Sequence, residues 1–543
     1  MVFARRSTTL LAAIIASCAM VLSLTACTSD NKTVVDGQTT VTSNSAGGVA
    51  VFTPSDGITL NQQTPLNKWA KLVHDLTKAL VDAGFKKGDI DHTTSDSLDK
   101  QSRAIQDFVV DHLSNNTTDD SGIAIAPDNM TLLVAPVVEA DASTRQYGDY
   151  VSQNLSTNDA TDGEATSDGE SSEDDSSKDD SSNTESDSTA SDEQAQAVDR
   201  LVSSLKLAKE SGMHVVLLGN SIEGYKPDAF VKFSDAQTIG KLQAEKMVSK
   251  LKLDKASKDN PKYIEVLLPY TAMDEKGNAN DSTFAQEAFR GIWQVLGSYY
   301  QKGVVESPSG TLDGKSTEND WQAVAYDAAK EGSTAKVLDK RLAKTDGQST
   351  LTRIDGIITM NDYIASEVVK ELDDLGYTGS AADINPQITI SGIVGNITGK
   401  KDLSRDAVPD PIKSPENDNA NDSSSSDDDA DKDTSASDKD RDSQWPLVTG
   451  YGAYVSNIPS IVNGKQWMTG MEDRQTIATD IAQACAKLNK DEALNSMPSI
   501  RNSEVGGVKK IPTINEPLLA VSAGNLKSAL IDPGYISLAD AGL

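Results

Sequence analysis

Short apolar runs alternate with amphipathic helical patterns along most of this chain, and this alternation limits its fold more than any other feature. Apolar strand-like runs occur at Gly48–Phe52, Leu132–Ala135, His214–Leu218, Tyr263–Leu268, Ile354–Thr359 and Pro446–Thr449. Helical patterns lie between and after them, at 66–83, 195–211, 238–251, 283–300, 363–375 and 474–488. Strand, loop and helix units in this order predict α/β lobes built on parallel sheets with helices on both faces.

Two acidic segments interrupt the alternation. Asp159–Glu193 carries 14 acidic side chains and one basic one, and Glu416–Asp442 carries 11 and three. Together they supply 21 of the 32 net negative charges. They contain too little apolar surface to offset their conformational entropy, so we expect disordered inserts at about 156–194 and 405–444. Because the charge is negative and belongs to the inserts, we do not expect nucleic acid as a partner.

The N-terminus has the pattern of an export signal. Arg5 and Arg6 precede an apolar run that ends in Leu24-Thr-Ala-Cys27. The run is shorter than the roughly 20 residues that span a bilayer, which predicts a signal peptide at 1–26. Leu-Thr-Ala-Cys resembles the bacterial lipobox, which implies that Cys27 is acylated and that 27–47 is a flexible tether. An ordinary secretory signal with a chance cysteine is the alternative.

The remaining side chains give no pattern for catalysis. Cys485 is the third cysteine beside Cys18 and Cys27, and its helical context predicts a small buried apolar residue. The four histidines lack metal-site spacing, and Lys432 occupies the glycine position of the one calcium-loop-like run. Hydrolase, ATPase and dinucleotide-binding motifs are missing from the sequence. We therefore expect no enzymatic activity, no cofactor and no metal.

Several sequence blocks occur in an order that matches one protein family. The blocks are Lys68-Trp69, Phe233–Ala244, Asn280–Gly291, Ile354–Asp362, Val448–Gly450, Ile461–Gln466 and Asn515–Leu526. They resemble type I periplasmic binding proteins, specifically the xylose or multiple-sugar-binding receptors of ABC transporters. The resemblance runs from about residue 48 to the C-terminus, apart from the inserts. It implies two Rossmann-like lobes, joined by three crossovers, with ligand bound in the cleft between them.

The resemblance also divides the chain. It implies an N-terminal lobe at 48–250, a C-terminal lobe at 251–450, and crossovers with the remaining elements of both lobes at 451–543. Doubly wound sheets bind ligands outside the carboxyl ends of their strands, which independently gives the same place for the site.

Polar side chains at the strand ends and at the head of the first helix form the predicted ligand site. A sugar needs planar polar groups for its hydroxyls and an aromatic face for its ring. The predicted ligand-binding residues are Asp56, Lys68, Trp69, Asn220, Asp235, Asn280, Asp281, Asn361, Asp362, Tyr451 and Asp473. Asp281 and Asp362 directly precede helices, where an Asp also caps free backbone N–H groups. The two roles are compatible, and both stay open.

The chain departs from the family pattern at three of these places. Gly219-Asn-Ser221 stands where the family has Tyr-Asp-Arg, and Tyr451-Gly452 stands where it has Gln-Asp. Lys68 replaces an Arg and so lacks the bidentate fork. A changed sugar, a glycoside or a nonsugar ligand all remain open.

The resemblance implies a monomeric receptor, and the lipobox at Cys27 implies that it is lipid-anchored on the outer face of the cell membrane. Such a receptor captures a small carbohydrate by hinge closure and passes it to an ABC permease, with the lipid as its only membrane contact. The altered site residues and the long inserts leave a second reading open. In that reading the chain is a diverged receptor that senses or scaffolds and no longer takes part in transport.

Overall fold

The computed structural model describes most of the chain beyond residue 45. The described ranges are 46–56, 65–115, 126–138, 144–150, 153–156, 185–273, 281–343, 350–382 and 444–543. The predicted signal peptide, Cys27, Asn280 and most of both acidic inserts lie outside them. Within the described ranges, no helix is both long enough and apolar enough to cross a bilayer.

A seven-stranded sheet forms the centre of the first lobe. Its strands, in spatial order, are β15 (Ile500–Val505), β16 (Val508–Asn515), β7 (Ala229–Lys232), β5 (His214–Leu218), β3 (Met130–Val134), β1 (Gly48–Pro54) and β2 (Ile90–Ser95). All neighbours run parallel except β15 and β16. These two form a hairpin through Gly506 and Gly507, whose positive φ angles suit a two-residue turn.

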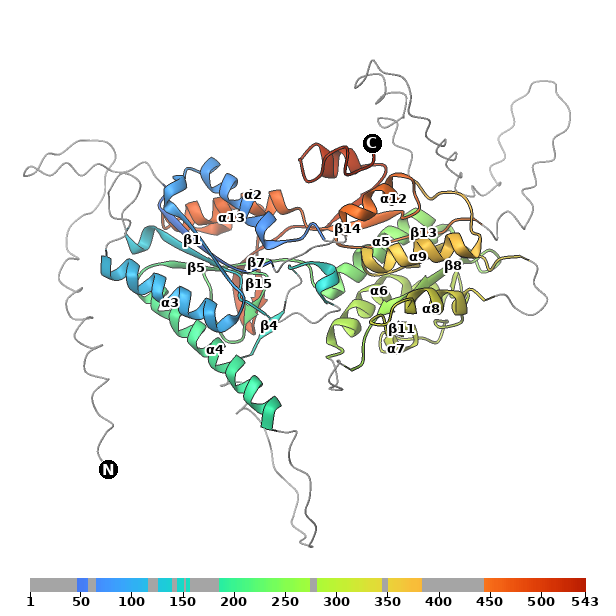
Figure 1. Ribbon diagram of the computed structural model, residues 1–543, viewed down its shortest axis with the longest axis horizontal. Coiled ribbons are helices and arrows are strands. Elements are labelled where there is room, and N and C mark those ends of the chain that lie inside the picture. Colours follow the sequence, from blue (N-terminus) through green and yellow to red (C-terminus); the bar gives the residue numbers. More distant parts are fainter. Residues whose placement is uncertain are drawn as a thin grey trace, which may run out of the picture. The chain divides into compact units, whose positions relative to one another are not determined.

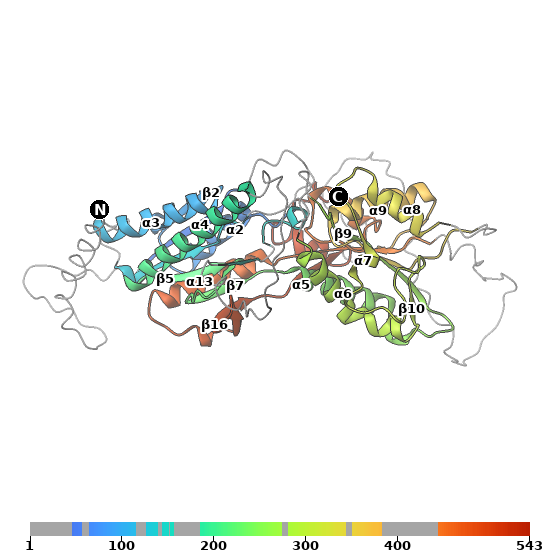
Figure 2. The same cartoon turned by 90° about the horizontal axis from the view of Figure 1, so that it is seen from below.

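Apolar side chains of strand β1, next to the edge strand β2, are buried on both faces of this sheet. The covering helices are α2 (Trp69–Asp82) and α13 (Arg474–Leu488) on one face, and α3 (Leu98–Asn115) and α4 (Glu185–Glu210) on the other. Val49 and Val51 pack with α2 and α13, whereas Ala50 and Phe52 pack with α3 and α4. Figure 1 shows the two helix pairs on opposite faces, and Figure 2 shows α3 and α4 side by side. The doubly covered parallel sheet confirms the fold predicted from the alternation.

Helix α4 begins earlier than the sequence predicts. We expected it to start at Ala195, after an insert reaching residue 194, but the helix starts at Glu185. The helix thus begins within the last residues of the predicted insert.

The second lobe has a smaller parallel sheet. Its strands, in spatial order, are β10 (Val305–Glu306), β8 (Lys262–Val266), β12 (Gly356–Ile358) and β13 (Leu447–Val448). The covering helices are α5 (Ala236–Leu251) and α6 (Thr283–Gln301) on one face, and α8 (Ser333–Arg341) and α9 (Asp362–Leu375) on the other. A short parallel pair, β9 (Leu268–Pro269) and β11 (Ala325–Tyr326), follows β8 and α7 (Trp321–Val324). Both faces are again covered.

Helix α5, which we expected to end the first lobe, packs against α6 of the second. Two glycines permit this close approach. A Cβ on Gly291 would lie 2.0 Å from the Gln237 carbonyl oxygen, and a Cβ on Gly240 would lie 2.2 Å from that of Ala288. The second lobe therefore begins at Ala236 rather than at residue 251.

Within the part of the chain that the structure describes, three crossovers join the lobes, as the resemblance implied. The crossovers run from β7 to α5, from β14 (Met468–Met471) to α13, and from β16 to β17 (Leu519–Ser522). Strands β14 and β17 pair with each other in antiparallel register, so two of the crossovers lie side by side. Helix α12 (Ile458–Val462) and the C-terminal turn Lys527–Ile531 contribute to one small apolar core beside them.

Candidate functional site

The carboxyl ends of the two sheets meet at a buried group of polar side chains at the crossovers, which we name the crossover cluster. It consists of Asn67, Ser234, Tyr451 and Glu472. The Tyr451 hydroxyl lies 2.5 Å from Ser234 Oγ and accepts from Asn67 Nδ2 at 3.1 Å. The Ser234 backbone N–H donates to Glu472 Oε1 at 2.6 Å. Because Ser234 follows β7 and Tyr451 follows β13, the cluster links the two lobes.

Glu472 is a buried carboxyl group without a nearby cation. Among the described residues, no Lys, Arg or His forms an ion pair with it, and its side chain is almost fully buried. Burial raises the pKa of Glu472 to about 7, although the hydrogen bonds from Ser234 and Tyr451 oppose the rise. The crossover cluster therefore contains a group that changes its protonation state near neutral pH.

Asp362 is the second buried carboxyl group at the sheet edges. It is the first residue of α9, and it accepts from Gln466 Nε2 at 2.7 Å and from the Tyr454 N–H and Thr469 Oγ1 at 2.9 Å each. Burial raises the pKa of Asp362 to about 6, and these hydrogen bonds oppose the rise. The carboxylate ties α9 to the segments around β14 and is fully buried.

A third carboxyl group caps the first helix. Asp149 accepts from Lys68 Nζ at 2.9 Å and from the Trp69 backbone N–H at 3.2 Å, and Asp56 accepts from the Ala70 N–H at 3.0 Å. Negative charge is favoured at a helix N-terminus. Burial raises the pKa of Asp149 to about 6, Lys68 opposes the rise, and Asp56 adds to it. The sequence analysis missed Asp149, because no motif marks it and its partners lie about 80 residues away.

Trp69 belongs to an aromatic core instead of an open surface. Its ring centroid lies 5.0 Å from that of Tyr150 and 5.8 Å from that of Phe233. Only 3% of Trp69 is exposed. Its contact with a ligand stays a prediction, whereas its contribution to the core of the first lobe is observed.

Four of the predicted site residues cap helices or turns. The backbone N–H donors are Thr238 for Asp235, Thr283 for Asp281, Ile364 for Asn361 and Thr476 for Asp473, at 2.7, 2.9, 2.9 and 3.3 Å. Asn220 is held by backbone on both sides, since its Oδ1 accepts from the Gln153 N–H and its Nδ2 donates to the Pro136 carbonyl. The capping role that we considered for Asp281 is confirmed, while ligand contact by these residues stays a prediction.

One segment of the chain lies between the two lobes, and we name it the strap, Gln146–Tyr150. On the second lobe, Gln146 accepts from Asn361 Nδ2 at 3.1 Å through its side chain and from the Tyr454 hydroxyl at 2.7 Å through its carbonyl. The Tyr147 ring lies 4.7 Å from Phe284 and 6.3 Å from Tyr451.

On the first lobe, the strap contacts the head of α2 through its other end. Asp149 binds Lys68 and Trp69 as described, and its N–H donates to the Asn67 carbonyl at 2.9 Å. The Tyr150 ring stacks at 4.9 Å on Phe233. The rings of Tyr147 and Tyr150 are each 1% exposed. A short pair, β4 (Asn154–Leu155) with β6 (Ser221–Ile222), follows the strap.

An open pocket lies on the second lobe at the carboxyl ends of β9 and β11. Its volume is about 660 Å³, and Tyr270, Trp321 and Tyr326 line it together with Asp327 and Lys330. The Tyr270 and Trp321 rings meet edge to face at 5.1 Å. Aromatic faces beside a few polar groups suit the binding of a sugar ring. The sequence analysis did not predict this pocket, because its residues are not spaced in any motif.

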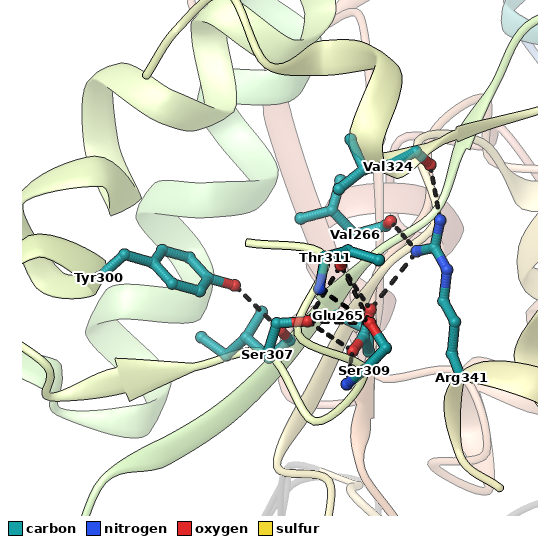
Figure 3. Close-up of polar contacts among 9 residues, drawn as sticks. Glu265, Val266, Tyr300, Ser307, Ser309, Thr311, Val324 and Arg341 are labelled. Atoms are coloured by element: carbon teal, nitrogen blue, oxygen red, sulfur yellow. Dashed lines mark hydrogen bonds and ion pairs between the residues drawn. The ribbon is translucent and has the colours of Figure 1, made fainter. Parts of the chain in front are cut away.

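A fully paired carboxylate lies deeper in the second lobe, as Figure 3 shows. Glu265 on β8 accepts from Ser307 Oγ at 2.7 Å and from the Ser309 N–H at 2.8 Å, and Arg341 Nη1 lies 3.4 Å from its other oxygen. Arg341 also donates to the Val266 and Val324 carbonyls. This network joins β8 to α7 and α8. Within the described ranges, no group of acidic, His and Cys side chains is arranged to hold a metal ion.

No protein-family model and no curated protein matches this chain. Solved structures resemble it at low identity. An ABC transporter solute binding protein from Clostridium phytofermentans with bound beta-D-glucose is 18% identical over 91% of this chain and 99% of its own, with a TM-score of 0.44. A carbohydrate transporter solute binding protein from Chloroflexus aurantiacus in complex with D-glucose is 17% identical over 91% and 98%, with a TM-score of 0.43.

A periplasmic ribose ABC transporter from Conexibacter woesei is also similar. It is 12% identical over 90% of this chain and 96% of its own, with a TM-score of 0.42.

Proposed function

We propose that this chain is the extracytoplasmic solute-binding lipoprotein of an ABC importer of the xylose or multiple-sugar type. It binds a small carbohydrate between its lobes and delivers it to the permease. The observation that carries the proposal is the pair of parallel sheets, joined by three crossovers, whose carboxyl ends meet at the crossover cluster. Ligands of such sheets bind outside these ends.

Hinge closure is the proposed mechanism. Among the described residues the chain passes from one lobe to the other at the crossovers, and Ser234 and Glu472 lie on two of them. A ligand that contacts both lobes favours the closed arrangement by its differential binding energy. The aromatic pocket around Tyr270 supplies the ring-stacking surface that a sugar needs.

Titration calorimetry against a panel of mono- and oligosaccharides tests the carbohydrate part. We expect at least one sugar to bind, and we expect Tyr270→Ala to weaken that binding by about tenfold, the effect of losing one stacking ring. Tyr299→Ala is the matched control, because Tyr299 lies on the surface of α6 and bonds to Asp254. A panel without any response would contradict carbohydrate binding.

Lipid anchoring through Cys27 has its own test. Metabolic labelling with a fatty acid is expected to label the wild-type chain and not Cys27→Ser. The variant is expected in the soluble fraction. Equal labelling of both chains, or membrane retention of the unlabelled variant, would contradict an anchor at Cys27.

A second candidate function, a receptor that senses or scaffolds without transport, is favoured by the strap. Gln146–Tyr150 fills space between the lobes that a transported ligand is expected to use. Uptake of the bound sugar by cells with and without the gene separates the candidates. An importer component gives loss of uptake on deletion, and a sensor leaves uptake intact.

A further inference from the structure

Residues of the predicted ligand site are already in contact with the chain itself. The strap touches Lys68 and Trp69 on the first lobe, and Asn361 and Tyr451 on the second. We infer that the strap is an internal competitor that occupies the interlobe ligand position, so that a ligand binds only when the strap is released. This inference rests on the proposed function and adds a regulatory step to it.

The strap satisfies the groups that a ligand would use. The Asp149 carboxylate binds Lys68 Nζ and the first N–H of α2, both of which suit an acidic or hydroxyl group of a ligand. The Tyr150 ring packs on Trp69 and Phe233, as the apolar face of a sugar ring would. The competition is therefore chemical as well as steric.

On the second lobe, the strap also occupies positions at which a ligand would contact the protein. Tyr147 packs in the same apolar core as Phe284 and Tyr451, although it comes from a segment that follows β3 of the first lobe. The Asn361 side-chain amide Nδ2 donates a hydrogen bond to Gln146 Oε1. Release of the strap uncovers both positions at once.

The fit of the strap depends on a glycine. Gly148 has a φ of +99°, and a Cβ at this position would lie 2.7 Å from the Cβ of Asn67. The next residue, Asp149, donates its N–H to the Asn67 carbonyl. Any other residue at 148 is strained in this conformation and pushes the strap away from α2.

The competition has a direct consequence for affinity. Only molecules with a released strap bind ligand, so the apparent dissociation constant is the intrinsic one divided by the released fraction. A substitution that weakens the strap raises this fraction and tightens binding. Most substitutions in a binding site weaken binding instead, so the sign of the effect is diagnostic.

Calorimetric titration of the full chain with D-xylose, D-glucose and D-glucuronate tests the inference. D-Glucuronate is included because its carboxylate can replace that of Asp149. The strap variants are Gly148→Ala and the isosteric Asp149→Asn. The control is Asp355→Asn, an ion-paired Asp of the second lobe with a side-chain exposure of 15%, against 20% for Asp149.

We expect both strap variants to bind at least one of these sugars about tenfold more tightly than the wild type, and Asp355→Asn to bind as the wild type does. Binding by the strap variants alone would support the inference equally. Unchanged or weaker binding by folded strap variants would overturn the strap and leave the proposed function standing. If Gly148→Ala fails to fold, Asp149→Asn decides the result. No binding by any chain would overturn carbohydrate binding, and the strap with it.

Discussion

Glu265 in the second lobe and Glu472 at the crossovers are almost equally buried, yet only Glu265 has a cation beside it. Glu265 is held by Arg341 and by the loop Ser307–Thr311, all within one lobe (Figure 3). Glu472 is held by neutral donors between the lobes. The paired carboxylate fixes one lobe, whereas the unpaired one gives the crossovers a group that titrates near neutral pH.

Removing the cation beside Glu265 tests the difference between the two carboxylates most strongly. Arg341→Ala leaves the Glu265 charge buried without a partner and removes two hydrogen bonds to backbone carbonyls. We expect a loss of about 3–5 kcal/mol in the free energy of unfolding, measured by urea titration. Lys100→Ala breaks an exposed ion pair with Asp96 and is expected to cost less than about 1 kcal/mol. Similar losses in both variants would show that the buried Arg341–Glu265 pair contributes no more to stability than an exposed ion pair does.

Neutralising Glu472, the carboxylate without a cation, is expected to raise the free energy of unfolding instead of lowering it. The pKa of Glu472 rises from 4.5 to about 7 on folding, so the folded protein binds the proton more tightly than the unfolded chain. The stability of the wild type therefore falls as the pH rises from about 4.5 to about 7 and then levels off. Glu472→Gln keeps the acceptor oxygen and removes this fall, so we expect it to be more stable at pH 8 by roughly 2–3 kcal/mol.

Urea titrations at pH 5 and pH 8 measure the effect, and Glu265→Gln is the matched control. That variant leaves Arg341 without its carboxylate partner, so it is expected to lose stability. If the two Gln variants change stability in the same direction at pH 8, the difference between the two regions is not what we describe.

Removing the Tyr451 hydroxyl, an uncharged group of the crossover cluster, is expected to change the free energy of unfolding by a smaller amount. Tyr451→Phe removes a buried hydroxyl that bonds with Asn67 and Ser234, and we expect it to cost about 1–2 kcal/mol in thermal or urea unfolding. Tyr299→Phe removes an exposed hydroxyl that bonds to Asp254, and its expected cost is below about 0.5 kcal/mol. A fully stable Tyr451→Phe variant would mean that the cluster does not hold the lobes together.

The smallest expected effect concerns a residue with two predicted roles. Asp281→Ala removes the acceptor for the Thr283 N–H at the start of α6, and we expect it to cost about 0.5–1 kcal/mol. If the residue acts as a cap alone, the affinity for a sugar is unchanged in calorimetry. A tenfold loss of affinity at unchanged stability would instead assign Asp281 to the ligand.

The elements that the sequence predicts best have both a clear period and a clear boundary. Helix α13 and strand β5 have the predicted bounds, because a helix cap precedes the first and Gly219 follows the second. Cys485 on α13 is buried as predicted, and burial raises the pKa of its thiol. The three crossovers came from the family resemblance and not from periodicity.

The site could be predicted only as a set of strand ends. The sequence places Asn361, Asp362 and Tyr451 at the carboxyl edge of the second sheet, where the structure also has them. It gives no sign of which residues their polar groups bond to. Asp149 and Tyr147 were missed because their partners are distant in sequence and no local pattern marks them. Contacts of this kind depend on the folded arrangement of both lobes.

Amide hydrogen exchange of residues 146–150, with and without the sugar that binds, tests the account most directly. In the free protein the Asp149 N–H is bonded to the Asn67 carbonyl, so it is expected to exchange slowly. If the strap is displaced by ligand, these amides exchange faster in the complex, while those of the core strand β5 are unchanged or slower. Slower or unchanged exchange of the strap in a saturated complex would contradict the account.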